Sequence, residues 1–218
     1  MRKWLIDIFV MAFIALVAAS CSGDGKQNQF VLDGELVNGK VAKTVYLYKY
    51  LSEYNKIELL DSAVIKSGSF HMSGSCEEPS EAFVRLDKEH DVYGFVLENA
   101  TLRMKIGQNS YAVTGTDDND RLSMLVMLQH RAVNNRKHIQ DAYSKLVADS
   151  SLTKSAEDSL LDLYRSQSAC LRDSVYKAIN ERIDARPEFA RVAFRTLSFT
   201  LSPLQADSLS VRLGFARK

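Results

Sequence analysis

The sequence predicts an α+β fold, in which an N-terminal antiparallel β-sandwich or open barrel is followed by a long helical hairpin and short C-terminal helices. Two observations support this. Apolar residues recur with a period of two from Phe30 to about Thr116, and the period then changes to that of a helix. We therefore expect a β-sandwich domain at 30–116 and an α-helical region at 117–218.

Seven or eight short strands are expected in the first domain. In the clearest of them, Leu102, Met104 and Ile106 alternate with polar residues, so one face of the strand is apolar and the other faces water. Asn38-Gly39 marks a turn between the first two strands, and another turn lies at 66–69.

Two helices of about thirty residues each follow, and they form an antiparallel hairpin. The first begins near Thr116, and Asp149-Ser150-Ser151 ends it. The second begins near Thr153. Pro187 starts a third helix, and Ser202-Pro203 starts a short fourth one, because proline is well tolerated in the first turn of a helix.

The N-terminus has the pattern of a targeting segment. Arg2 and Lys3 precede the apolar run 8–17, which is too short to span a bilayer, and the small residues 18–20 stand directly before Cys21. This pattern resembles a bacterial lipobox, in which a signal peptidase cuts before a lipidated cysteine. An ordinary secretory signal that happens to end near a cysteine is the other interpretation.

A lipobox implies that 1–20 is a lipoprotein signal peptide, that Cys21 is the lipidation site, and that 21–29 is a flexible tether. Two or three acyl chains, such as palmitate, would hold the protein on a membrane permanently. We expect it in the cell envelope, anchored to a bacterial membrane, with the outer membrane as the first choice, and facing the periplasm or the surface.

Charge argues against a nucleic-acid partner. The chain has 28 Lys and Arg against 27 Asp and Glu, and loss of 1–20 would leave 26 of each. A neutral surface gives no electrostatic footprint for nucleic acid.

A family resemblance covers about 30–145. It is carried by the stretches Val45–Tyr50, Leu59–Pro79, Gly94–Ile106 and Val113–Leu122. They resemble the β-rich domain-of-unknown-function family that precedes thioredoxin-like domains (of the alkyl hydroperoxide reductase/thiol-specific antioxidant type) in Bacteroidota lipoproteins. The family positions are occupied by Gly34, Asp61, Ser62, Gly68, Phe70, Gly74, Glu98 and Gly115. The sequence departs from the family at Asn99-Ala100, where a glycine is favoured.

The family's partner domain carries a Cys-x-x-Cys motif, but Cys21, Cys76 and Cys170 form none, so we expect no thioredoxin domain here. We expect a non-catalytic, membrane-anchored binding or scaffold module without a cofactor. The resemblance implies an alternative, an accessory to thiol-disulfide exchange that docks a separate thioredoxin-like protein in trans. A deep polar cleft with strongly perturbed carboxylates would favour a third class, a hydrolase.

Several residues are metal or disulfide candidates. Cys76 and Cys170 are expected as isolated, mostly buried thiols rather than a disulfide. The histidines form no metal-ligand spacing; they are His71, His90, His130 and His138. The acidic run 117–120 lacks the glycine and distal glutamate of a calcium loop, and a helix N-terminus explains it.

Tyr46, Tyr48 and Tyr50 form a stripe that could stack on a sugar or peptide, although a half-buried sheet face packed on the hairpin is simpler. Asp-Ser followed by an aliphatic residue occurs four times and resembles a bacterial O-glycosylation sequon. The candidate serines are Ser62, Ser159, Ser174 and Ser208.

Overall fold

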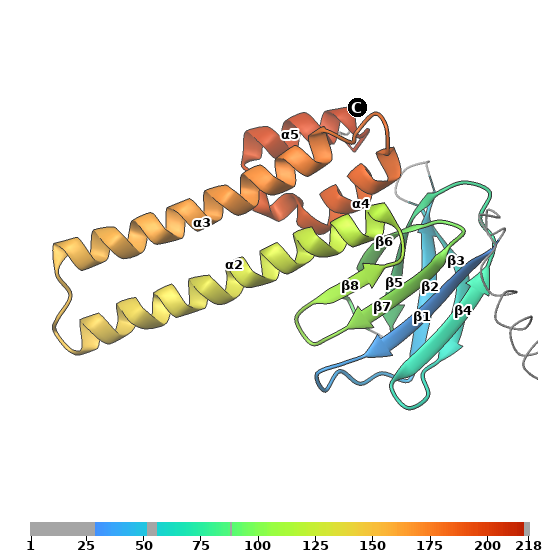
Figure 1. Ribbon diagram of the computed structural model, residues 1–218, viewed down its shortest axis with the longest axis horizontal. Helices are drawn as coiled ribbons and strands as arrows, with labels where there is room; N and C mark the ends of the chain where they lie inside the picture. Colours follow the sequence, from blue (N-terminus) through green and yellow to red (C-terminus); the bar gives the residue numbers. More distant parts are fainter. Residues whose placement is uncertain (1–28, 52–55, 88, 216–218) are drawn as a thin grey trace, which may run out of the picture.

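The computed structural model describes residues 29–51, 56–87 and 89–215. Eight strands come first and four α-helices follow, so the predicted α+β fold is confirmed (Figure 1). The predicted signal peptide, and all but the last residue of the predicted tether, lie outside the described residues.

The strands are β1 (Phe30–Leu36), β2 (Thr44–Tyr50), β3 (Ile57–Val64), β4 (Ser69–Gly74), β5 (Ser80–Leu86), β6 (Tyr93–Leu97), β7 (Thr101–Ile106) and β8 (Tyr111–Thr114). The helices are α2 (Asp117–Ala148), α3 (Lys154–Asn180), α4 (Pro187–Leu197) and α5 (Pro203–Arg212), with a 3-10 turn, η2 (Ser198–Thr200), before α5.

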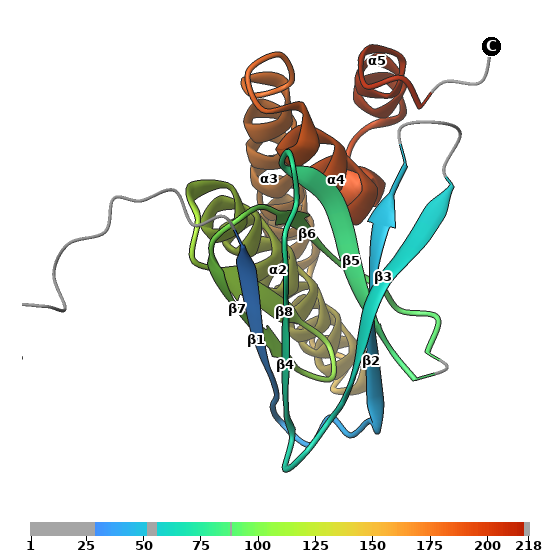
Figure 2. The same cartoon turned by 90° about the vertical axis from the view of Figure 1, so that its right-hand side faces the viewer.

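The strands form an open sandwich of two four-stranded sheets, ordered β4-β1-β7-β8 and β3-β2-β5-β6 (Figure 2). Neighbouring strands are antiparallel except for β1 and β7, which pair in parallel with Leu32 opposite Leu102. The expectation of a purely antiparallel sandwich is wrong for this pair. In chain order, β5 and β6 of the second sheet come between β4 and β7 of the first sheet. Strand β7 then lies beside β1 and runs in the same direction.

The core of the sandwich is made by the alternating apolar residues of both sheets. Leu102, Met104 and Ile106 are buried and the residues between them are exposed, as the pattern predicts. The predicted turns are also present, because φ is positive at Asn38, Gly39, Ser67 and Gly68. Such φ values suit tight turns, and both turns lead from a strand of one sheet to a strand of the other.

The first two turns of α2 cover the open edges of both sheets. Asn119 is fully buried; its Oδ1 accepts from the Val96 N–H of β6 at 2.9 Å, and its Nδ2 donates to the Val96 carbonyl at 2.8 Å. One turn later, the Ser123 hydroxyl accepts from the Val113 N–H of β8 at 2.7 Å and donates to the Val113 carbonyl at 2.6 Å. The two side chains therefore complete the hydrogen bonding of two edge strands.

Beyond these contacts, α2 and α3 extend away from the sandwich as a long hairpin, and α4 lies between their near ends and the second sheet (Figure 1). Leu122, Val175 and Ile179 of the hairpin pack with Phe189 and Val192 of α4 in a second core. This arrangement gives one continuous body with two hydrophobic clusters.

A buried ion-pair cluster joins α2 to the segment between α3 and α4. The carboxylate of Asp118 accepts from Arg182 Nη1 at 2.8 Å and from Arg186 Nε at 2.8 Å, and its side chain is 1% exposed. Asp117 accepts from the same Arg182 at 2.8 Å, and Glu98 lies 3.6 Å from Arg186. The acidic run therefore binds two arginines as well as sitting at a helix N-terminus.

We predict that replacing Asn119 with alanine lowers the free energy of unfolding by about 2–4 kcal/mol, because two buried backbone groups of Val96 lose their partners. Urea unfolding measures this. Arg121→Ala, on the exposed side of the same helix, is the control and should change stability by less than about 0.5 kcal/mol. Equal losses for the two variants would contradict the edge-capping role.

Candidate functional site

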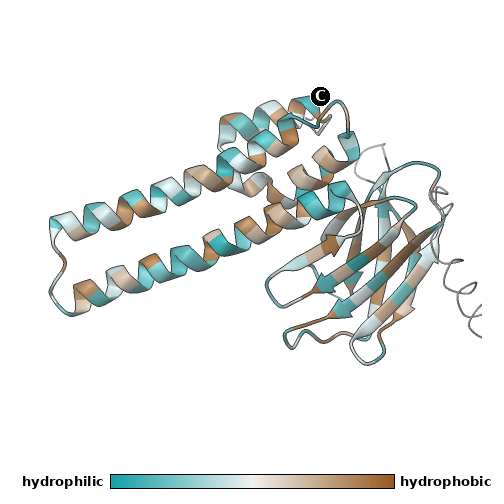
Figure 3. Cartoon of the chain, viewed as in Figure 1, coloured by the Kyte–Doolittle hydropathy of each residue, from teal (hydrophilic) through white to brown (hydrophobic). Residues whose placement is uncertain are grey.

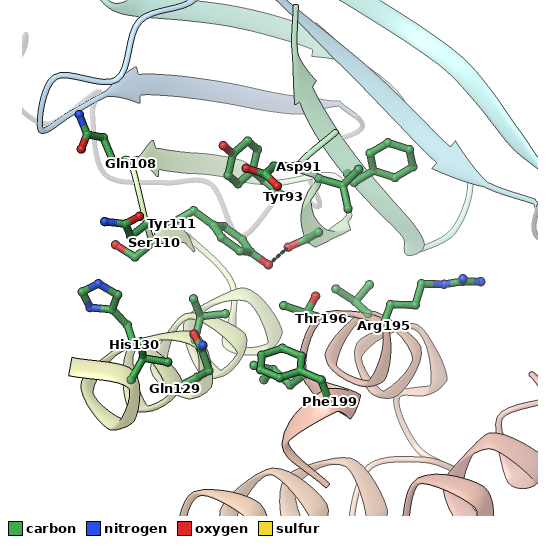
Figure 4. A pocket seen from close by; sticks show the side chains of 18 of the residues that line it. Asp91, Tyr93, Gln108, Ser110, Tyr111, Gln129, His130, Arg195, Thr196 and Phe199 are labelled. Atoms are coloured by element: carbon green, nitrogen blue, oxygen red, sulfur yellow. Dashed lines mark hydrogen bonds between the residues drawn. The ribbon is translucent and has the colours of Figure 1, made fainter. Parts of the chain in front are cut away.

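A cleft of about 1050 Å³ lies where the sandwich meets the helices (Figure 4). One wall comes from β5, β6 and the neighbouring loop residues 90–92 and 108–110 of the sandwich. The opposite wall comes from α2, from the end of α4 and from η2. Because α2 is fixed to β6 and β8 by its first two turns, the positions of these walls follow from the edge contacts described above.

Tyr111 lies at the back of the cleft, between the two walls. Its hydroxyl donates to the Gly94 carbonyl at 2.9 Å (Figure 4), and burial raises the pKa of the phenol to about 12. Gly94 lets α4 approach the sheet closely, since a Cβ there would stand 3.2 Å from Thr196 Oγ1 and 3.3 Å from Val192 Cγ1. Tyr111 is therefore a neutral hydrogen-bonding group held by the framework.

Among the polar side chains of the cleft lining, the uncharged ones outnumber the charged ones. They are Gln108, Asn109, Ser110, Gln129, Asn134 and Thr196, together with the hydroxyls of Tyr50, Tyr93 and Tyr111. Burial also raises the pKa of the Tyr50 and Tyr93 phenols, so these groups stay protonated at neutral pH. At the mouth, the ring of Phe199 is 70% exposed and offers a flat apolar surface.

The charged lining residues are fewer and partly engaged. Arg195 donates to Glu81 at 2.9 Å, and its guanidinium lies over the rings of Tyr50 at 4.0 Å and Phe215 at 4.4 Å. Burial raises the pKa of the Glu81 carboxyl, and its hydrogen bond to Arg195 opposes that shift. Asp91 and Lys137 lie on opposite walls, so the cleft carries no strong charge of one sign.

One protein family is similar to the N-terminal part of the chain. Residues 30–122 match the family described as "Domain of unknown function (DUF4369)". We call the matched residues 30–122 the DUF4369 region. The predicted resemblance to a β-rich domain-of-unknown-function family is thereby confirmed over this range. The DUF4369 region contains all eight strands and the start of α2. Asn119, one of the two α2 residues that complete the edge strands, therefore lies within it.

Comparison with solved structures gives a much weaker likeness. One match is a protein described as a "putative cell adhesion protein" from Bacteroides ovatus, at 11% identity and a TM-score of 0.29. The alignment covers 42% of this chain and 44% of that one, and we infer neither fold nor function from it. No curated protein matches the chain.

The histidines that looked scattered in the sequence are partly brought together. His90, next to the DUF4369 region's strand β6, and His130 of α2 both line the cleft. His71 lies elsewhere, with its Nδ1 2.7 Å from Asp33 Oδ1 on an exposed sheet face, and His138 is exposed on α2. Within the described ranges, no group of three or more His, Cys, Asp or Glu residues could hold a metal ion.

Both described cysteines are free thiols. Cys76 is half-buried in the DUF4369 region, burial raises the pKa of its thiol, and its backbone N–H donates to Asn99 Oδ1 at 3.0 Å. Asn99, which departs from the family pattern, thus fixes the neighbouring turn. Cys170 is exposed on α3, so the expectation of two mostly buried thiols is wrong for it. Cys21 lies outside the described residues.

The four O-glycosylation candidates all lie in regular secondary structure. Ser62 is exposed on β3, Ser159 on α3 and Ser208 on α5, whereas Ser174 of α3 is half-buried. The Ser159 hydroxyl donates to the Ser155 carbonyl at 2.8 Å. Modification of these serines remains a prediction, and three of the four side chains are accessible to a glycosyltransferase.

The tyrosine stripe is half-buried, as the simpler interpretation expects. The side chains that cover it, however, do not come from the helical hairpin. Tyr48 stacks on Phe83 with ring centroids 5.1 Å apart, and the Arg85 guanidinium lies 5.0 Å from the centre of the Tyr48 ring. At Tyr50 the covering side chain is Arg195 of α4 rather than a residue of the hairpin. The end of the stripe at Tyr50 is also part of the cleft lining.

Sequence patterns do not bring the cleft residues together. The cleft residues come from strand edges, loops and two helices far apart in the chain, and the sequence candidates among them are Tyr50, His90 and His130. A detectable signal was the cluster of amide and hydroxyl residues in 108–111, directly after a well-defined strand. Such clusters also mark ordinary turns, and spacing alone does not separate the two.

The phenol of Tyr111 gives a pH prediction. Its pKa is about 12 in the folded protein and 10.0 without the fold, so the unfolded chain loses this proton first as pH rises above 10. Folding stability should therefore fall, by about 2 kcal/mol at pH 11.5 from this group alone. Urea unfolding from pH 8 to 11.5 should show a shallower alkaline loss for Tyr111→Phe than for the wild type, and parallel curves would contradict this.

Proposed function

We propose that this protein is a lipid-anchored, non-catalytic binding module of the cell envelope, which holds a neutral, hydroxyl-rich ligand such as an oligosaccharide in the cleft. The observation that carries the proposal is the lining, where amide and hydroxyl side chains outnumber charged ones beside an exposed aromatic ring.

The lining chemistry matches sugar hydroxyls. Each amide of Gln108, Gln129 and Asn134 both donates and accepts hydrogen bonds, and a sugar hydroxyl does the same. The exposed face of Phe199 suits the apolar face of a sugar ring. A volume of about 1050 Å³ is at the upper end for single small ligands, which favours a chain of several sugar units.

The ionisable groups favour binding over hydrolysis. The lining phenols with shifted pKa values are all held in their neutral form, which suits hydrogen bonding rather than proton abstraction. The strongly buried carboxylate near the cleft, Glu81, is paired with Arg195 and Arg191 and is therefore engaged in the framework.

The membrane anchor in this proposal rests on the N-terminal pattern that ends at Cys21. Among the described residues, no helix is both long enough and apolar enough to cross a bilayer. Lipidation of Cys21 would give membrane attachment through acyl chains alone.

The cleft is tested by titrating the protein with neutral oligosaccharides of four to seven sugars, including maltoheptaose and cellohexaose, by calorimetry. Asn134→Leu combined with Gln129→Leu should weaken binding at least tenfold, since each lost hydrogen bond costs about 1 kcal/mol. The matched control is Asn135→Leu, because Asn135 is exposed on the same helix outside the cleft.

Two results would contradict the proposed ligand class. One is binding of anionic saccharides only, and the other is an equal loss of binding in the double variant at Gln129 and Asn134 and in the Asn135→Leu control. If no saccharide binds and the immobilised protein instead retains a thioredoxin-like protein from an envelope extract, the accessory role in thiol-disulfide exchange replaces the proposal.

The anchor is tested separately. Cys21→Ser should leave the precursor uncut or release the protein into the soluble fraction, because the serine hydroxyl cannot carry the thioether-linked lipid. Fractionation and intact-mass measurement check this, with Cys170→Ser as the control that stays in the membrane. A normally processed, membrane-bound Cys21→Ser protein would overturn the anchor.

A further inference from the structure

The two long helices carry one apolar stripe that is covered only near the sandwich. There, Leu122 and Leu125 of α2 and Val175 and Ile179 of α3 are buried in the cluster that includes α4. Helix α4, which covers this part of the hairpin, ends at Leu197, and η2 then leads to α5. From that point outward, no third helix of the described chain lies on the hairpin (Figure 1).

The same stripe continues along the uncovered part. Tyr143 follows Leu125 by 18 residues, which is five full helical turns, so both lie on one face of α2. Leu161 precedes Ile179 by 18 residues on α3, with the same consequence. Yet Tyr143 is 42% and Leu161 40% exposed.

The outer hairpin has no buried side chain at all within 133–170, a range that the structure describes completely. Apolar residues nevertheless recur along both helices out to the tip (Figure 3). Exposed ones include Val133, Tyr143, Val147, Leu161 and Tyr164. Two helices alone leave such a stripe in water, whereas a bundle of four covers it.

Charge divides the hairpin from 131 to 172, a range slightly longer than the outer hairpin, into two complementary zones. The middle zone, 131–140 with 165–172, holds five Lys and Arg residues and no Asp or Glu. The tip zone, 141–164, holds five Asp and Glu residues and two Lys. The formal charges are therefore +5 and −3 at neutral pH.

We propose that a second copy of this chain covers the stripe, with the two hairpins antiparallel in a four-helix bundle. A two-fold axis across the hairpins places the acidic tip of each copy on the basic middle zone of the other, with Glu157 near Arg172 of the second copy. A parallel pair would instead place like charges together. This proposal does not depend on what the cleft binds.

The size of the face sets the strength of the pairing. Sixteen residues of α2 span about 24 Å, and two helices are about 20 Å wide, so about 500 Å² per copy would be buried. The total of about 1,000 Å² is at the lower limit for a specific interface. The dimer should therefore be reversible and favoured by confinement on a membrane surface.

Cysteine cross-linking of the full chain in intact membranes tests the pairing. In a Cys170→Ser background, Gln140→Cys lies near the proposed axis on the stripe side of α2, and Lys145→Cys lies on the opposite side. A short bismaleimide should yield a product of twice the chain mass at position 140 and at least fivefold less at position 145. Equal yields, no product, or a product with a protein of different mass would overturn the proposal.

A charge exchange tests the antiparallel register in the same assay. Arg172→Glu should lower the yield at position 140 at least fivefold, and adding Glu157→Arg should restore it. Both residues are on the helix surface, so circular dichroism should be unchanged. Loss of the product in the double variant as well would contradict the antiparallel arrangement.

Discussion

The structure depends on how α2 completes the edges of the two sheets. Strands β6 and β8 end their sheets on the same side of the sandwich, and each would leave a backbone N–H and carbonyl without partners. Asn119 and Ser123, four residues apart on one helix face, satisfy both. Because this fixes the position and direction of α2, it also fixes the hairpin and one wall of the cleft.

Two carboxylates, each paired with two arginines, then hold the C-terminal part of the chain against α2 and the second sheet. Asp118 binds Arg182 and Arg186, and Glu81 of β5 binds Arg195 and Arg191 of α4. A buried carboxylate is costly to desolvate and needs good partners, so these pairs add little net stability. Their effect is to select one orientation, since a rotated helix would leave a charge unpaired. The cleft consequently keeps its shape between two independently fixed walls.

Periodicity was enough to predict the strands, the hairpin and the starts of the last two helices, because each depends on local spacing and on Pro187 and Pro203. Pairing across distance was not predictable in the same way. The parallel β1–β7 pair, the Asn119–Val96 contact and the cleft each join residues at least 23 positions apart or from several elements. The acidic run at 117–120 is an example. Its pattern predicts a helix start, but it does not show that Asp118 also forms a buried ion pair with two arginines.

The contrast between the two ends of α2 has a consequence for function. Its first turns are held by buried hydrogen bonds, whereas beyond Ala132 it has no buried residue, and its contacts include Arg136 over the Tyr164 ring at 5.4 Å. Exposed pairs of this kind stabilise a helix weakly, so the outer hairpin of an isolated chain is held less firmly than the first turns of α2. Val133 and Lys137 lie at the boundary and also line the cleft. Ordering the outer hairpin against a second copy would therefore order one wall of the cleft, and binding in the cleft would favour pairing by the same free energy.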